Sequence, residues 1–371
     1  MLMTIFAFVA VIGPLVFIHE MGHYLVGRWC GVQAEAFSIG FGPEIIGWVD
    51  RRGTRWRIAA LPLGGYVRFK GDMNAASQSD PEWASKSAAE KEGSFPSKNV
   101  WQRMAIVAAG PVVNLLFAVI LLGGLAMVRG EAVSEPVISH VAQGSAAEEA
   151  GLKAGDRIVR IMGRDVHSFQ DIASTISLRP AEALPYVIER NGERFEKLIA
   201  AGTRLEQDRF GNTYRIGQLG VASGVISRRD VSLLRAPVVG FNQAVSITRT
   251  ALDGLGQIIT GRRPVSELGG PLKIADVSGQ AASMGPEAFL FFMALISINL
   301  GFINLLPIPM LDGGHLLFYI IEAIGQRPVS PVIQEWAFRS GLALLLTMML
   351  LVTFNDLGSF GLWRSLSGLI G

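Results

Sequence analysis

The stretch that decides the fold is Met1–His23, MLMTIFAFVAVIGPLVFIHEMGH, an apolar run that ends in two histidines and a glutamate. Residues 1–18 carry no charged side chain. About 20 apolar residues in a helix cross the ~30 Å hydrocarbon core of a bilayer. A signal peptide would have basic residues before its apolar region, but no lysine or arginine precedes this run. The stretch therefore predicts a retained membrane span with polar groups at its end.

The composition extends this pattern to the whole chain. Of the 371 residues, 50% are hydrophobic and 17% are charged, where soluble domains carry about a quarter charged residues. Further apolar runs cover residues 104–128, 288–311 and, more weakly, 340–355. The sequence thus predicts four spans. A net charge of +2 and the lack of a basic face argue against nucleic acid as a partner. The single cysteine, Cys30, leaves histidines and carboxylates as the only candidates to hold a metal.

The basic residues predict the orientation in the membrane. Residues 28–103 contain 11 of the 33 lysines and arginines, and basic loops next to spans stay in the cytoplasm. Four spans then place both termini and residues 129–287 outside, with residues 322–339 inside. Trp101 and Arg103 are expected to anchor the second span at the interface. Long loops contribute little to this rule, so the basic residues of 129–287 do not contradict it.

The motif His19-Glu20-Met21-Gly22-His23 carries the chemistry. Residues i and i+4 share one face of a helix, so the two imidazoles can hold one zinc ion while Glu20 acts as general base. Polar groups inside an apolar span usually serve a function, because their insertion is costly. The alternative interpretation is that these side chains only mark the interfacial end of the helix.

A catalytic zinc needs a third protein ligand and an open position for water. The end of the third span, Asn304–His315, reads NLLPIPMLDGGH. Its two prolines break the helix just before Asp312, and spans one and three run in the same direction. Asp312 and His315 are both candidate ligands, and the residues alone do not choose between them. Asp312 could also be a simple turn residue, while His140 and His167 are expected at the surface of the soluble loop.

Several separated motifs resemble one family over nearly the whole chain. Besides the histidine motif, they are Gly40-Phe-Gly-Pro43, Leu61-Pro-Leu-Gly-Gly-Tyr-Val67, Ala109-Gly-Pro-x-x-Asn114 and Asn304-x-x-Pro-x-Pro-x-Leu-Asp-Gly313. Together they resemble the site-2 protease family of intramembrane zinc metalloproteases, and most of all its bacterial regulator of sigma-E protease branch.

The resemblance implies a role for each matching residue. His19, His23 and Asp312 would bind Zn²⁺, with Glu20 as the catalytic base. Asn304 would contact the substrate or the transition state, where a developing oxyanion needs a donor. Residues 54–72 would form a membrane-associated β-hairpin region that reaches towards the active site. Its candidate substrate-contacting residues are Gly64, Gly65 and Tyr66.

Residues 129–203 predict an α+β module inserted between the second and third spans. Strand-like runs cover 137–141, 157–162 and 186–190, followed by an Asn191-Gly192 hairpin turn. Short helices are expected over 145–149 and 169–177. The run Ala150–Val159 resembles a PDZ domain, in which a strand edge receives an extended peptide. The best-known subgroup has two tandem PDZ domains, whereas this loop has room for one. It would either bind a cut peptide end or exclude bulky substrates, and the resemblance favours exclusion.

The expected fold is therefore a mainly α-helical polytopic membrane protein with a β-hairpin region and one inserted PDZ-like domain. The expected divisions are 1–128, 129–203, 204–287 and 288–371. Within the third, residues 204–235 are expected to be an irregular connector and 236–262 a helix along the membrane surface. Residues 269–274, GGPLKI, depart from the pattern expected of the family before span three, which leaves their local role open. Residues 76–99 are expected to be a mobile cytoplasmic loop.

The predicted activity is zinc-dependent hydrolysis of peptide bonds within or near transmembrane segments. The expected partners are single-span membrane proteins, such as anti-sigma factors or signal-peptide remnants, together with the lipid bilayer of a bacterial inner membrane and a peptide at the PDZ-like domain. One alternative is a catalytically silent scaffold that recruits partners through that domain. A metal transporter is less favoured, because one ligand cluster gives no pathway across the bilayer. The chain lacks the Gly-x-Ser-x-Gly motif of serine hydrolases.

Overall fold

A computed structural model describes residues 2–72, 87, 91–207, 213–224, 227–262 and 269–359. It divides into two compact units, residues 1–122 with 268–353, and residues 123–267 with 354–371. We call the first the membrane unit. The loop predicted over residues 76–99 lies largely outside the described residues.

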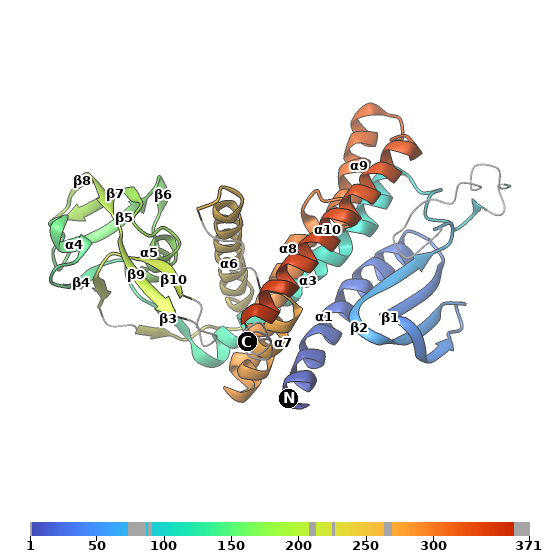
Figure 1. Ribbon diagram of the computed structural model, residues 1–371, viewed down its shortest axis with the longest axis horizontal. Coiled ribbons are helices and arrows are strands. Elements are labelled where there is room, and N and C mark those ends of the chain that lie inside the picture. Colours follow the sequence, from blue (N-terminus) through green and yellow to red (C-terminus); the bar gives the residue numbers. More distant parts are fainter. Residues whose placement is uncertain are drawn as a thin grey trace, which may run out of the picture. The chain divides into compact units, whose positions relative to one another are not determined.

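Four helices of the described chain are long and apolar enough to cross a membrane (Figure 1). They are α1 (Leu2–Trp29), α3 (Val100–Arg129), α8 (Pro286–Leu305) and α10 (Pro331–Ser359). Mean hydropathy over their best windows is between 1.8 and 2.5. The prediction of four spans is confirmed, and the helices that contain runs one, two and four extend beyond those runs.

The third span is shorter than its apolar run of 288–311. Helix α8 ends at Leu305, and Leu306 is extended, with φ −64° and ψ 142°. The reason is Pro307, because a proline ring disfavours the helical conformation of the residue before it. A further helix, α9 (Asp312–Gly325), begins after the proline segment. Helix α7 (Pro271–Ser283) begins inside the GGPLKI segment, and its Gly279 lies against Thr4 of α1.

Glycines bring the helices of the membrane unit into close contact. A Cβ atom on Gly22 of α1 would lie 2.6 Å from the main-chain oxygen of Ala109 in α3. A Cβ atom on Gly110 of α3 would clash with the imidazole of His23. A Cβ atom on Gly301 of α8 would lie 2.8 Å from the main-chain oxygen of Pro111. Small residues at such crossings let helix backbones approach each other. Helix α3 therefore packs directly on both α1 and α8.

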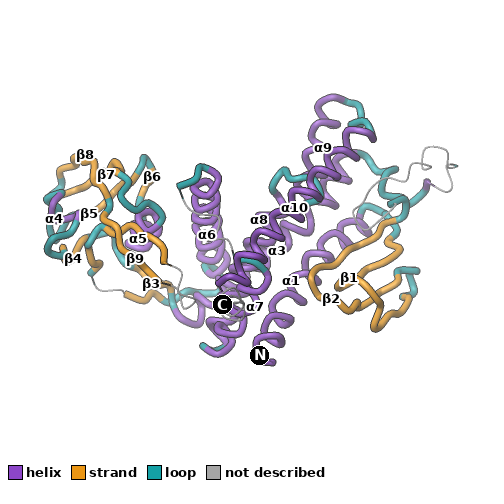
Figure 2. Tube along the Cα trace, in the orientation of Figure 1, coloured by secondary structure: helices purple, strands orange, loops and turns teal. Residues whose placement is uncertain are grey.

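The β-hairpin region consists of β1 (Ala34–Val49) and β2 (Arg55–Phe69), paired antiparallel (Figure 2). The first half of β1 lies between two segments of β2, since Phe37 pairs with both Val67 and Trp56. Residues 65–69 thereby form one edge of the small sheet and residues 44–49 the other. Phe37 stacks on Trp56 with ring centroids 4.5 Å apart, so aromatic packing holds the sheet together.

The second unit contains a strand-rich module, which we define as residues 131–229. Its main sheet has the antiparallel order β6-β5-β7-β8, made of β6 (Arg164–Asp165), β5 (Arg157–Ile161), β7 (Ala183–Arg190) and β8 (Glu193–Ala200). Two helices cover its core, α4 (Ala146–Glu149) and α5 (Phe169–Ser177). Asn191 and Gly192 both have positive φ, 52° and 88°, and join β7 to β8 in the predicted two-residue turn. The core contains Tyr186 and several fully buried aliphatic side chains, among them Ile138, Ile158, Leu184 and Ile188.

The prediction of an irregular connector over residues 204–235 is wrong. This segment contains short strands, which are β9 (Gly202–Gln207), β10 (Thr213–Gln218), β11 (Val221–Ser223) and β12 (Ser227–Arg229). The strand pairs are β9 with β10, β11 with β4 (Ile138–Val141), and β12 with β3 (Glu131–Val133). Strands of three to six residues show too little alternation to be visible in a sequence, and β11 and β12 pair with strands at least 80 positions away.

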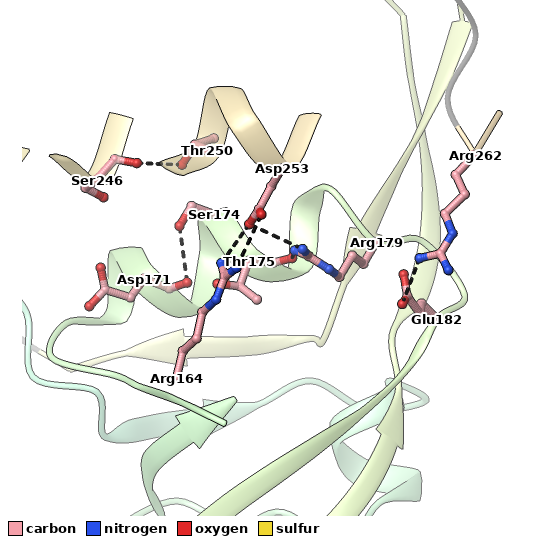
Figure 3. A network of polar contacts seen from close by, with 10 residues as sticks. All are labelled: Arg164, Asp171, Ser174, Thr175, Arg179, Glu182, Ser246, Thr250, Asp253 and Arg262. Carbon is pink, nitrogen blue, oxygen red and sulfur yellow. Dashed lines mark hydrogen bonds and ion pairs between the residues drawn. The ribbon is translucent and has the colours of Figure 1, made fainter. Parts of the chain in front are cut away.

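The predicted helix over residues 236–262 is α6 (Ala236–Ile259). Its Asp253 accepts hydrogen bonds from Arg164 and Arg179 of the strand-rich module (Figure 3). Beyond the helix, Arg262 donates to Glu182. One face of α6 is thus held by the module through charged side chains. Its placement at a membrane surface stays a prediction.

Candidate metal centre

The histidine motif lies inside helix α1, which continues for six residues beyond His23. His19 and His23 project from successive turns, with ring centroids 4.8 Å apart. Their Nε2 atoms lie 3.2 Å from each other. His19 is buried, at 8% exposure. The i, i+4 spacing therefore brings the two imidazoles together as the sequence predicts.

Asp312 is the first residue of α9, and it completes the cluster. Its Oδ2 lies 3.2 Å from Nε2 of His19 and 3.6 Å from Nε2 of His23. Ligand atoms of the three residues all lie within 4.8 Å of one another. Among the described residues this is the group of histidine, cysteine and carboxylate side chains that could hold a metal ion. An acidic side chain at the start of α9, which follows the third span, thus meets the histidine pair of the first span.

The segment before α9 explains how Asp312 reaches the histidines. Residues 306–311 leave the helical path, and Met310 has a positive φ of 80°. A Cβ atom on Gly314 would lie 2.5 Å from the main-chain oxygen of Ile308. The two glycines after Asp312 therefore let α9 start tightly against the proline segment. His315 points elsewhere, with its ring 4.9 Å from that of Phe338 in α10. The choice that the sequence left open falls on Asp312.

The outer nitrogen of each histidine has its own partner. Nδ1 of His23 lies 2.9 Å from the main-chain oxygen of Ile106. Nδ1 of His19 lies 3.2 Å from Nδ2 of Asn114, in the middle of α3. Such second contacts fix the ring orientation and the tautomer of a metal-binding histidine. Asn114 is part of a sequence motif, but the motif assigned it no role. A single amide within the apolar run of residues 104–128 was the feature that could have indicated one.

Glu20 is buried at 8% exposure, one residue along the helix from His19. Strand β2 passes beside it, since a Cβ atom on Gly65 would lie 2.9 Å from Cγ of Glu20. Gly64 has φ 157° and lies against the ring of Phe41, and Tyr66 stacks on the same ring at 6.2 Å. The structure therefore brings Gly65 to the helix of the metal centre, while Gly64 and Tyr66 belong to the β1/β2 sheet. Substrate contact by these three residues stays a prediction.

Asn304 is half-buried and lies one residue before the end of α8. Among the described residues, its side chain makes no hydrogen bond to His19, His23 or Asp312. Its predicted role in the transition state is therefore not visible as a contact and stays a prediction. His140 and His167 are exposed, as expected for surface residues.

The residues present fit zinc. Two imidazole nitrogens and one carboxylate oxygen form a donor set typical of catalytic zinc sites, which keep a fourth position for water. Within the described part of the chain, the ion-pair partners of Asp312 are these two histidines rather than a lysine or arginine. The cluster is therefore arranged to share a cation.

Comparison with known proteins agrees with this chemistry. Residues 7–348 match the family described as peptidase family M50. The chain belongs to peptidase family M50. The M50 peptidases include the site-2 proteases, so the family resemblance seen in the sequence is confirmed.

Two of the similar proteins, both named as putative zinc metalloproteases, come from bacteria of the genera Agrobacterium and Rhizobium. One, from Agrobacterium fabrum, is 43% identical over 358 residues and covers 95% of both chains. The other, from Rhizobium meliloti, is 42% identical over 359 residues, covering 95% of this chain and 96% of the relative. Metalloprotease MmpA of Caulobacter vibrioides is 35% identical over 384 residues, covering 97% and 96%. This M50 chain is thus a membrane-embedded zinc metalloprotease with a His-His-Asp metal site.

Proposed function

We propose that this zinc metalloprotease is an intramembrane endopeptidase of the regulator of sigma-E protease branch. Its substrates would be single-span membrane proteins, such as anti-sigma factors or signal-peptide remnants, cut within or near their transmembrane segments. One observation carries the proposal. Two of the three metal ligands, His19 and His23, lie within a membrane-spanning helix, so the scissile bond must come to the membrane to meet them.

The chain's own residues divide the chemistry among them. When zinc is bound, it supplies Lewis acidity and lowers the pKa of a bound water to ~7. Glu20, adjacent to both the ligands and strand β2, would take the proton of the attacking water and pass it to the leaving amine. The three ligands fix the position of the reaction relative to Glu20.

The β1/β2 sheet is suited to hold an extended substrate. A transmembrane helix hides its peptide bonds in internal hydrogen bonds, so it must unwind before cleavage. Residues 65–69 form one edge of the sheet, and Gly65 of that edge lies beside Glu20. A strand edge binds an extended peptide through main-chain hydrogen bonds, with little dependence on its sequence. Substrates with helix-destabilising residues would therefore be cut fastest.

A substrate series tests this step. Single-span substrates that differ only in Gly, Ala or Leu content near the cut should be cleaved more slowly as their helicity rises. Equal rates across the series would show that unwinding does not limit cleavage. Such a result would not contradict the proposed roles of the metal ligands and Glu20 in hydrolysis.

The orientation and the strand-rich module complete the proposal. The basic residues of 28–103 favour a cytoplasmic face for the β1/β2 sheet, with the strand-rich module and both termini on the outer side of a bacterial inner membrane. The module resembles a PDZ domain in the run Ala150–Val159. We favour a role as a filter that excludes substrates with bulky outer domains over one as a peptide receptor.

The deciding experiment compares purified wild-type protein with Glu20→Gln on a single-span substrate, with zinc content measured in both. Glutamine keeps the shape of the side chain and removes the base. We expect cleavage to be lost while zinc is retained. Equal cleavage by the two proteins would remove Glu20 as the base. Zinc absent from both, without cleavage, would favour a silent scaffold.

A further inference from the structure

Asn114 is a fully buried amide in the middle of an apolar span. It lies in α3 at 0% exposure, within a helix whose best window has a mean hydropathy of 2.5. Burying an amide costs free energy unless its polar atoms form hydrogen bonds. Its Oδ1 atom is buried and, among the residues that the structure describes, has no hydrogen-bond partner. The side chain therefore carries an acceptor that the surrounding residues leave unused.

The orientation of His19 defines what this acceptor could serve. Nε2 of His19 faces Oδ2 of Asp312 at 3.2 Å, so Nε2 is the atom turned towards the other ligands. A neutral imidazole that gives one nitrogen to a metal carries its hydrogen on the other. Nδ1 of metal-binding His19 is then a donor and needs an acceptor. The group next to it is the amide of Asn114, 3.2 Å away.

An amide can serve either tautomer of the ring. With its nitrogen towards His19, as placed here, Asn114 donates to Nδ1, and the imidazole keeps its hydrogen on Nε2, facing Asp312. Rotation of the amide by half a turn exchanges oxygen and nitrogen, which are nearly identical in shape. The unused Oδ1 then accepts from Nδ1, and the lone pair of Nε2 becomes free for the metal.

We propose that Asn114 is a positioning residue that selects the metal-binding tautomer of His19. The two histidines are then held by different means. Nδ1 of His23 faces the main-chain oxygen of Ile106 at 2.9 Å, which can only accept. His19 instead depends on the side chain of Asn114 in α3. Ser297 of α8 donates a hydrogen bond to the main-chain oxygen of Asn114 at 2.8 Å. This inference rests on the zinc centre and not on the proposed substrate.

A merely structural Asn114 would fill space between α1, α3 and α8. Two substitutions separate the roles. Asn114→Leu keeps the volume and removes the acceptor, whereas Asn114→Asp keeps an acceptor and removes the donor. Ser297→Ala is the matched control, because it removes a buried hydrogen bond to the same residue without touching His19.

The experiment measures zinc affinity on full-length protein in detergent, by competition with a chelating dye, after circular dichroism has established the helical content of each variant. Loss of an outer partner of a metal ligand costs about 10–100-fold in affinity. We expect that loss for Asn114→Leu, affinity within about threefold of wild type or higher for Asn114→Asp, and a shift in the Co²⁺ absorption bands of Asn114→Leu alone.

Three results would overturn the proposal. They are wild-type affinity in Asn114→Leu, an equal loss in Asn114→Asp, and an equal loss in Ser297→Ala. If Asn114→Leu does not fold, Asn114→Ser carries the same test, because its hydroxyl stops short of His19. Since affinity is measured without substrate, failure here is distinct from failure of the proposed function.

Discussion

The strand-rich module and the membrane unit each contain a carboxylate that is partly or fully buried. The side chains that contact these two carboxylates differ. In the module, Asp156 is 1% exposed and accepts from Nε and Nη2 of Arg190 at 2.6 and 2.7 Å. In the membrane unit, Asp312 is 20% exposed and faces two imidazoles. Arginine carries a permanent charge, so the first pair is complete. Imidazoles offer lone pairs, so the second arrangement suits a shared cation. The partner, more than the burial, decides which carboxylate is a ligand.

Replacing the two carboxylates in turn tests this comparison, and the largest effect is expected for Asp312→Asn. An amide oxygen is a weaker zinc ligand than a carboxylate, and even an outer-shell partner is worth about 10–100-fold in affinity. We expect zinc affinity to fall at least about 100-fold and cleavage to drop to background. Metal analysis of the purified protein and a single-span substrate assay measure both. Asp156→Asn is the matched control and should retain its zinc; zinc retained in Asp312→Asn would remove this residue from the ligand set.

The second prediction concerns the helix crossing that supports the metal centre. In Gly110→Ala the new methyl group would clash with the imidazole of His23, so α3 or the ring must shift. A displacement of about 1 Å at a reacting centre can cost about 100-fold in rate. We expect a loss of kcat of that order. Gly124→Ala in the same helix is the control, because a Cβ atom there meets nothing within 4 Å. Equal activity of the two variants would show that the crossing tolerates the methyl group.

The sequence predicted the membrane unit better than the strand-rich module. An apolar run of about 20 residues has few alternatives to a span, and the i, i+4 rule brings His19 and His23 together in any helix. The ends of the helices were harder to predict from the sequence. Helix α8 stops six residues before the end of its apolar run because Pro307 acts on Leu306; the sequence predicted a break at the prolines but not the residue at which the helix ends. Helix α7 was missed because its apolar content is modest.

The residue spacing alone left Asp312 and His315 open as ligands, and before the structure only the family resemblance favoured Asp312. The main chain between Leu305 and Asp312 leaves the helical path, and Met310 takes a positive φ of 80°. No residue pattern fixes where such a segment leads. The strands β11 and β12 were missed for a related reason, since they pair with β4 and β3 across most of the module. Long-range pairing is set by the folded chain and leaves little local signal.

The third prediction returns to Asp156 as a structural group. Asp156→Asn leaves Arg190 without its anion and weakens the charge-assisted hydrogen bonds, each worth about 1.5–3 kcal/mol. We expect the free energy of opening of the strand-rich module to fall by about 2 kcal/mol. Hydrogen exchange of the β5 and β7 amides in the full-length protein measures it. Asp165→Asn removes an exposed pair with Arg160 and should change little, since such pairs contribute about 0–1 kcal/mol.

The pH dependence of the same module follows from the sign of the shift at Asp156. Burial would raise the pKa of this carboxyl, but the hydrogen bonds and charge of Arg190, together with the main-chain N–H and charge of Lys153, outweigh burial and hold the pKa below its ordinary value. The pair therefore stabilises the folded module above the ordinary pKa of about 3.9. Its contribution is lost as the pH falls through the lower folded value. We expect the urea midpoint to decrease over that range in wild type and to change less in Asp156→Asn.

Fluorine NMR of protein labelled with fluorotyrosine can follow this transition, since Tyr186 lies in the core of the module at 0% exposure. The resonance is assigned with Tyr186→Phe. Parallel curves for wild type and Asp156→Asn would mean that other groups control the acid sensitivity.

The smallest effect is expected where α6 meets the strand-rich module, at a third carboxylate, which is paired with arginines like Asp156 but is about as exposed as Asp312. Asp253 is 22% exposed and is shared by Arg179, at 8%, and Arg164, at 62%. Burial would raise its pKa, but the two arginines outweigh burial and lower it. Since Arg164 is largely in water, much of its attraction is screened. Asp253→Asn should therefore cost about 1 kcal/mol, seen as faster exchange of the α6 amides with the β5 and β7 amides unchanged. Glu182→Gln, which loses only the exposed Arg262, should have a still smaller effect. If Asp253→Asn lost as much free energy as Asp156→Asn, an arginine would stabilise a carboxylate equally well at the surface and in the core.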